Sequence, residues 1–111
     1  MSKNLVGMQV TLTSAATAYC LYDLMAAIDS TVPVNYCYIH LQADLSTNPV
    51  LVGDSAISAT RYGYKINNGG ATGAEATVEW HTPANNISIK DIYLWGITTA
   101  SLKVNVLLIA M

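Results

Sequence analysis

Apolar and polar residues alternate with a period of two along most of this 111-residue chain. Because successive side chains of a strand point to opposite faces, this period predicts strands that bury one face. The clearest examples lie near the two ends, where the apolar positions are Val6, Met8, Val10 and Leu12 in residues 5–13 and Leu102, Val104, Val106 and Leu108 in residues 101–109. We therefore expect one strand near each end of the chain.

The middle of the chain repeats the same alternation in shorter pieces. Residues 36–44 and 75–80 are predicted strands, and shorter β-prone runs occupy 50–52, 57–60, 62–66, 87–89 and 91–95. In the first of these, the apolar face carries Cys37, Ile39, Leu41 and Ala43, and the polar face carries Tyr36, Tyr38, His40 and Gln42. Turn-forming residues at 46–49 and 67–70 separate the runs, so we expect 36–44 and 50–52 to pair as a hairpin.

One segment departs from the period of two. In residues 17–28, Leu21, Leu24, Met25 and Ile28 fall at i, i+3, i+4 and i+7, which is the spacing of one helix face. The polar cluster before Pro33 ends this segment, so we expect one short helix near 17–28.

Many short strands separated by turns, with a single helix, predict an all-β protein. We expect a β-sandwich or a jelly-roll-like antiparallel barrel that forms one domain over residues 1–111. A βαβ fold would need longer helical segments between its strands.

Composition changes the range of possible partners. The chain is 52% hydrophobic but only 11% charged, with a net charge of −2, so it lacks the basic excess on which nucleic-acid binding depends. Its longest apolar run near the end, residues 106–111, is much shorter than the roughly 20 residues of a membrane span. We expect neither a nucleic-acid nor a membrane partner. The abundant Ser, Thr, Asn and Gln suit a surface that becomes buried against another protein.

The motifs for catalysis are weak. Gly53-Asp54-Ser55 resembles the nucleophile block of GDS-type esterases, but neither His40 nor His81 follows an aspartate by two or three residues. We therefore interpret Gly53-Asp54 as a turn and predict no catalytic residue and no enzyme activity.

No closely spaced pair of cysteines or histidines indicates a metal site, and no glycine-rich loop indicates a nucleotide site, so we predict no metal and no cofactor. Cys20 and Cys37 are expected to be reduced, buried thiols, although their spacing also permits a disulfide.

Tyrosines offer a different function. A sheet that exposes aromatic rings can stack on sugars, while Asn and Gln bond to hydroxyl groups. The candidates are Tyr36, Tyr38, Tyr62, Tyr64 and Tyr93. Aromatic pairs also stabilise neighbouring strands, so a glycan-binding module remains an alternative function.

Five short motifs follow one another in the middle of the chain. They are Cys-Tyr-Ile-His-Leu-Gln-Ala-Asp at 37–44, Asn-Pro-Val-Leu-Val-Gly-Asp at 48–54, Ile-Ser-Ala-Thr at 57–60, Tyr-Gly-Tyr-Lys-Ile at 62–66 and Ile-Lys-Asp-Ile-Tyr at 89–93. Together they resemble segments of small tailed-bacteriophage virion proteins of the head decoration (cement) or head-fibre-base type. That resemblance implies a β-rich, often trimeric protein bound outside the capsid lattice.

The resemblance implies a structural protein, made in the host cytoplasm, that decorates or cements the capsid surface of the virion. Its partners would be the major capsid protein or another virion protein, and further copies of itself in a homotrimer. The alternative is a glycan-binding or receptor-binding module of a virion fibre. We predict that the two terminal strands carry the contacts, through Leu5, Val6, Met8, Val10, Leu12, Leu102, Val104, Val106, Leu107, Leu108 and Ile109. Deleting residues 1–12 is then expected to abolish these contacts without unfolding the core.

Overall fold

The computed structural model describes residues 4–43, 50–66, 77–96 and 102–111. In chain order the elements are β1 (Asn4–Leu12), β2 (Ala18–Cys20), α1 (Leu21–Ala26), β3 (Asn35–Tyr36), β4 (Tyr38–Ala43), β5 (Val50–Gly53), β6 (Tyr64–Ile66), β7 (Thr77–His81), β8 (Ile87–Ser88), the 3₁₀ helix η1 (Ile89–Asp91), β9 (Tyr93–Gly96) and β10 (Leu102–Ala110). Most of these strands fall where the alternation predicts them.

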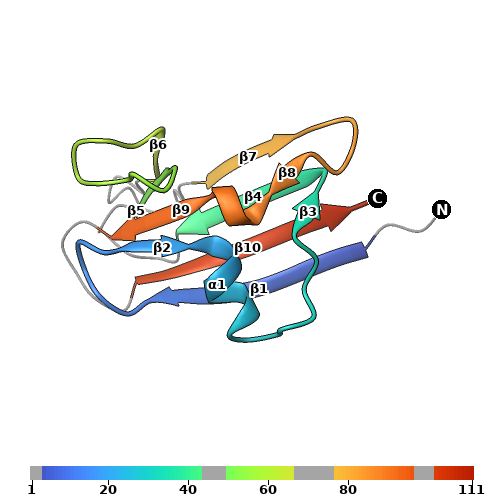
Figure 1. Cartoon of the computed structure of the whole chain (residues 1–111), viewed down its shortest axis with the longest axis horizontal. Coiled ribbons are helices and arrows are strands. Elements are labelled where there is room, and N and C mark those ends of the chain that lie inside the picture. The colour runs from blue at the N-terminus through green and yellow to red at the C-terminus, as the bar shows by residue number, and fades with distance from the viewer. Residues whose placement is uncertain (1–3, 44–49, 67–76, 97–101) are drawn as a thin grey trace, which may run out of the picture.

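Two four-stranded antiparallel sheets form the body of the protein (Figure 1). Sheet A has the order β1-β10-β4-β7, and sheet B has the order β2-β9-β5-β6. Strands β3 and β8 form a separate short pair. Successive strands of the main sheets mostly alternate between sheet A and sheet B, which is the arrangement of a jelly roll. The predicted all-β sandwich with one short helix is thus confirmed, in its jelly-roll form.

The core lies between the two sheets. Strand β10 buries every second residue, namely Leu102, Val104, Val106, Leu108 and Ala110, while the residues between them are exposed or half-buried. Sheet B supplies Val50, Val52, Ile66 and Leu94, and α1 adds Leu21 and Met25. The faces predicted as apolar for the two terminal strands are therefore the faces that pack into this core.

The helix is shorter than predicted. Residues 18–20 form β2 because Ala18, Tyr19 and Cys20 pair with Trp95, Leu94 and Tyr93 of β9, so α1 begins only at Leu21. Leu21 and Met25 are buried as the helical spacing predicts, but Ile28 lies beyond the helix and is 59% exposed. Pairing with a neighbouring strand outweighs a helical pattern this short, because an isolated helix of a few turns is only marginally stable.

The predicted hairpin between residues 36–44 and 50–52 is wrong. Strand β4 pairs with β10 and β7 in sheet A, whereas β5 pairs with β6 and β9 in sheet B. Residues 57–60 are also not a strand, since Ser58 makes only an isolated bridge with Arg61. The predicted turns at 46–49 and 67–70 lie outside the described residues.

Tyr36 was expected on a polar strand face, but the structure buries it completely. The strand breaks at Cys37, so Tyr36 belongs to β3 and pairs with Ile87 of β8. Its hydroxyl group is buried and has no hydrogen-bond partner among the described residues. Burial disfavours the phenolate, and the nearby charge of Asp29 adds to this, so the pKa of Tyr36 is raised above its ordinary value of 10.0.

Replacing Tyr36 by Phe is therefore expected to raise the free energy of unfolding by about 1 kcal/mol, because an unpaired buried hydroxyl is removed while the ring stays. A second effect depends on pH. The pKa of Tyr36 is higher in the folded chain than in the unfolded chain. The free energy of unfolding is therefore independent of this group's titration below pH 10 and falls as the pH rises further, because the unfolded chain releases the proton more readily. Urea denaturation of both proteins, at neutral pH and above pH 10, should show the steeper loss in the natural chain. A less stable Tyr36→Phe variant would contradict this account.

Candidate functional site

The strongest candidate site is the outer face of sheet A, meaning the side of β1, β10, β4 and β7 that points away from the core. Residues directly opposite each other in antiparallel strands share one face. The strand register therefore arranges this face in rows: Leu5-Ile109-Tyr38-His81, Gly7-Leu107-His40-Glu79, Gln9-Asn105-Gln42-Thr77 and Thr11-Lys103.

The β1 and β10 positions of the first two rows form an apolar patch. Leu5 is 67% exposed and Leu107 is 36% exposed, although both are large aliphatic residues. A Cβ atom at Gly7 would lie 3.7 Å from Cδ1 of Leu107, so the leucine side chain reaches over the glycine. Ile109 is half-buried beside them. Contiguous exposed apolar residues of this kind mark interaction surfaces more often than scattered ones do.

The third row is a ladder of neutral amides. Gln9 donates a hydrogen bond from Nε2 to Oδ1 of Asn105 at 2.9 Å, and Asn105 donates from Nδ2 to Oε1 of Gln42 at 2.9 Å. These amides already satisfy part of one another's hydrogen-bonding capacity. Covering them with another protein therefore costs less than covering isolated polar groups.

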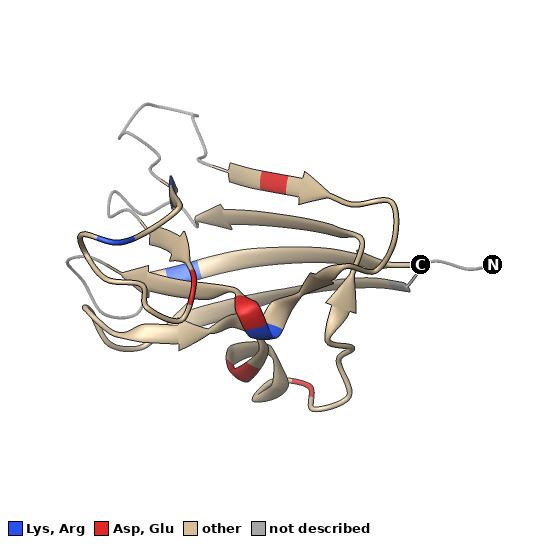
Figure 2. Cartoon of the chain, turned by 45° about the horizontal axis from the view of Figure 1, so that its top comes forward, with Lys and Arg blue, Asp and Glu red and all other residues tan. Residues whose placement is uncertain are grey.

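Few charges interrupt this face. Its four strands contain Lys103 and Glu79 but no other Lys, Arg, Asp or Glu, and Figure 2 shows the remaining charged residues of the described chain mainly in loops, short helices and sheet B. Glu79 accepts a hydrogen bond of 2.6 Å from the hydroxyl of Tyr38, and this bond raises the pKa of Tyr38. Low charge and paired polar groups are typical of the centre of a protein–protein interface.

The structure divides the predicted contact residues into three groups. Val10, Leu12, Leu102, Val104, Val106 and Leu108 are at most 4% exposed and belong to the core, so they cannot touch another protein while the sandwich is intact. Val6 and Met8 are half-buried against that core.

Leu5, Leu107 and Ile109 lie on the outer face of sheet A, and their role in contacts stays a prediction. The same face also carries residues at the polar positions of the alternation, namely Gln9, Tyr38, His40 and Asn105.

Asp54 forms a turn, as the sequence predicts. Its Oδ1 accepts a hydrogen bond from the backbone N–H of Ala56, and its Oδ2 forms an ion pair with Nη2 of Arg61, both at 3.0 Å. Ser55 lies in this exposed loop of sheet B, whereas His40 and His81 lie on strands of sheet A. The candidate nucleophile and both candidate bases therefore lie on different sheets.

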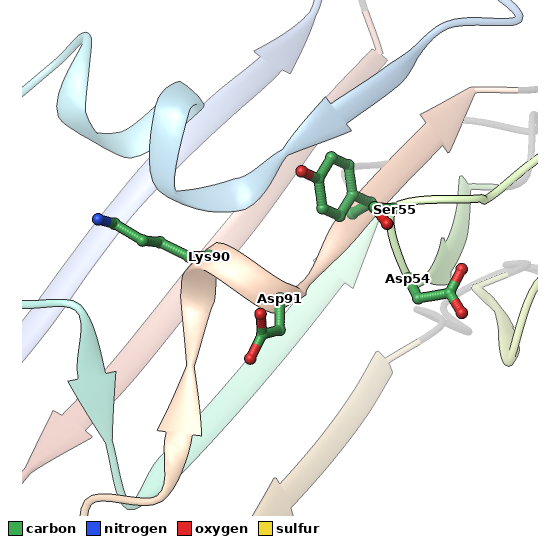
Figure 3. A pocket seen from close by; sticks show the side chains of 5 residues that line it. Asp54, Ser55, Lys90 and Asp91 are labelled. Carbon is green, nitrogen blue, oxygen red and sulfur yellow. The ribbon is translucent and has the colours of Figure 1, made fainter.

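A cavity of about 410 Å³ lies beside this loop and is lined by Asp54, Ser55, Lys90, Asp91 and Tyr93. Figure 3 shows that the side chains of Asp54, Lys90 and Asp91 point in different directions. Nζ of Lys90 lies 5.0 Å from the ring centre of Tyr22, where a cation–π contact holds it away from the carboxylates. The geometry does not focus an acid and a base on one point, as acid–base chemistry requires.

Both cysteines are free thiols, so the open alternative of a disulfide is not realised. The Cys37 thiol is buried and donates to the carbonyl of Ile109 at 3.3 Å, while the half-buried Cys20 thiol donates to that of Lys90 at 3.6 Å. Among the described residues, no three His, Cys, Asp or Glu side chains come together as metal ligands. The helices in the described part of the chain are all too short or too polar to span a bilayer.

No family model matches the chain, and no curated protein matches it. The resemblance to tailed-bacteriophage virion proteins is thus not supported by these comparisons. A solved structure is similar: a chain of the virus-like particle of extra small virus from the giant freshwater prawn Macrobrachium rosenbergii. The two chains are 11% identical, with a TM-score of 0.52 over 97% of this chain and 76% of the other. At that identity the likeness concerns the fold, and this chain shares its jelly roll with a chain of a viral particle.

Proposed function

We propose that this chain is a structural virion protein that acts through extended protein–protein contacts. The observation that carries the proposal is the jelly roll shared with a chain of a virus-like particle over 97% of this chain. The outer face of sheet A supports it, because that face combines exposed aliphatic residues with paired amides and little charge.

Within this role, we propose that the protein decorates or cements a capsid surface as a homo-oligomer, with a homotrimer as the expected form. A closed oligomer would cover the exposed leucines and the edge strands β1 and β7 of sheet A as the described residues form it. Several copies held together would also multiply contacts that are individually weak on the major capsid protein. This gives a small chain without a large charged surface a way to bind a shell firmly.

A second candidate is a subunit that builds the shell itself. The similar prawn-virus chain belongs to a virus-like particle, and this favours a chain that assembles with many copies of itself. The two candidates differ in the product that the purified chain forms alone. A closed trimer is expected for a decoration protein, and large particles are expected for a shell subunit.

Light scattering after size-exclusion chromatography, together with electron microscopy, measures that product. We expect a Leu107→Asp variant to weaken assembly by about 100-fold in the dissociation constant, because it places a carboxylate at the centre of the outer face of sheet A. The matched control is Ala59→Asp, which introduces the same charge at an exposed position in the loop between β5 and β6 of sheet B. Melting curves should confirm that both variants remain folded.

Two results would contradict the proposal. One is a natural chain that stays monomeric at every concentration. The other is a folded Leu107→Asp variant that assembles as well as the natural chain, or no worse than Ala59→Asp.

A further inference from the structure

Two surface cavities meet at Asp54, on the opposite side of the sandwich from the outer face of sheet A. The first, of about 410 Å³, includes Ser55 and Tyr93 in its lining. The second, of about 260 Å³, is lined by Gly53, Asp54, Arg61, Tyr62 and Gly63. Because Asp54 lines both, the two hollows are neighbouring parts of one surface depression. The larger of the two is by itself in the size range of small-molecule sites.

The loop that forms this depression is held in place by its own contacts. The backbone carbonyl of Asp54 accepts a hydrogen bond from the N–H of Ile57 at 3.0 Å, and Ser58 and Arg61 exchange two backbone hydrogen bonds. Ile57 is only 4% exposed, and its side-chain atoms lie 3.4 Å from the place where a Cβ atom of Gly53 would stand. The buried isoleucine therefore anchors the loop on sheet B. A site held in this way does not have to order itself when a ligand binds.

The polar groups of the depression favour a ligand without net charge. The side chains of Asp54 and Arg61 are 60% and 65% exposed, and they neutralise each other in an ion pair of 3.0 Å. The hydrogen bond from Arg61 also holds the pKa of Asp54 below its ordinary value, which favours the carboxylate form further. Arg61 bonds to Asp54 through Nη2, and a guanidinium has five N–H donors, while a carboxylate accepts several hydrogen bonds at once.

The aromatic residues of the depression supply an apolar surface beside these polar groups. Tyr62 is 44% exposed in the second cavity, and the half-buried Tyr93 lines the first. A tyrosine presents an apolar ring face together with a polar end. A sugar has the matching chemistry, because one face of its ring exposes C–H groups while its rim carries hydroxyls.

The structure separates the five tyrosines considered above. Tyr36 is wholly buried and cannot reach a ligand, and Tyr38 lies on the outer face of sheet A with its hydroxyl bonded to Glu79. Tyr64 bonds through its hydroxyl to the carbonyl of Thr77 at 3.3 Å and lines neither cavity. Only Tyr62 and Tyr93 line the depression around Asp54.

We propose that the depression around Asp54 binds a neutral saccharide, which stacks on Tyr62 and receives hydrogen bonds from Arg61 while its hydroxyls donate to Asp54. This inference is independent of virion assembly, since its residues lie on sheet B and its loops. A chain that assembles through sheet A would keep the site accessible on the other side of each subunit.

Titration of the full-length chain with neutral monosaccharides and disaccharides of glucose, galactose, mannose and N-acetylglucosamine tests the proposal, with binding followed by calorimetry and by NMR saturation transfer. Sialylated and sulfated glycans serve as charged comparators. We expect binding of at least one neutral sugar, and a loss of at least 10-fold in affinity in Tyr62→Ala and in Arg61→Ala. Tyr62→Phe, which keeps the ring, should stay within a few-fold of the natural chain.

The matched control is Tyr64→Ala, because Tyr64 is 45% exposed, close to the value for Tyr62, but lies outside the depression. We expect it to bind sugar as the natural chain does. The proposal is overturned if no neutral sugar binds, if only the charged glycans bind, or if Tyr64→Ala loses affinity as much as a folded Tyr62→Ala. Melting curves identify variants that fail to fold. If Tyr62→Ala or Arg61→Ala does not fold, the sugar affinities of Tyr62→Phe and Arg61→Lys are compared instead. Light scattering on the same samples reports assembly separately, so failure of one proposal does not affect the other.

Discussion

A chain that lacks residues 1–12 is expected to be unfolded, rather than folded and unable to assemble as the sequence alone suggests. Strand β1 pairs with β10 along its whole length, from Asn4 opposite Ala110 to Leu12 opposite Leu102. Val10 and Leu12 are fully buried, and Val6 and Met8 pack against the core. Removing these side chains from the core costs about 5–9 kcal/mol at the usual value for burial of an aliphatic residue. That loss is comparable with the whole stability of an ordinary domain, about 5–15 kcal/mol.

Circular dichroism and urea denaturation would detect this loss as the absence of a cooperative unfolding transition. A synthetic peptide of residues 1–12 is the matched control. Added to the truncated chain, it should restore the transition by pairing with β10, whereas a scrambled peptide should not. If the truncated chain unfolds cooperatively with nearly the stability of the full chain, β1 does not contribute to the core as described.

Leu108 and Leu107 are neighbours in β10, yet replacing each by alanine is expected to have very different effects. Leu108 is completely buried between the sheets, so Leu108→Ala should lower the free energy of unfolding by about 2–5 kcal/mol through lost burial and a residual cavity. Leu107 points to the outer face of sheet A and is 36% exposed, so Leu107→Ala should cost less than about 1 kcal/mol.

Denaturation of the dilute variants, under conditions where the chain is monomeric, separates the two effects from assembly. Assembly measured at higher concentration should show the opposite order among folded proteins, because only Leu107 contributes to the proposed contact surface. Equal destabilisation by the two substitutions would mean that the described alternation in β10 is wrong.

Local pattern was sufficient for most strands of this protein. In β1, β4, β7 and β10 the period of two predicts which residues share a face, because the alternation of side chains is a property of any extended chain. It also identified Gly53-Asp54 as a turn, since the aspartate side chain bonds to the backbone two residues ahead. The low charge of the terminal strands likewise follows directly from the residues.

The same pattern did not show which face meets a partner. Most of the residues assigned to intermolecular contacts stand on the apolar side of the terminal strands, which fills the core, whereas Leu5, Leu107 and Ile109 of the same set lie on the outer face. The outer face also includes polar residues between them, such as Gln9 and Asn105. A single chain has one apolar face per strand, and burial inside the sandwich takes precedence over contact with another protein because it needs no second molecule.

The sequence by itself determined that this is a β protein, where most of its strands lie and which side of its terminal strands is apolar. Only the tertiary structure decided that β4 and β5 belong to different sheets, that Tyr36 is buried, and that Tyr62 and Arg61 line one depression with Asp54. The physical reason is the range of the interactions. Alternation and turns depend on residues a few positions apart, whereas strand pairing joins residues as distant as Asn4 and Ala110 and is selected by how well both sheets close the core.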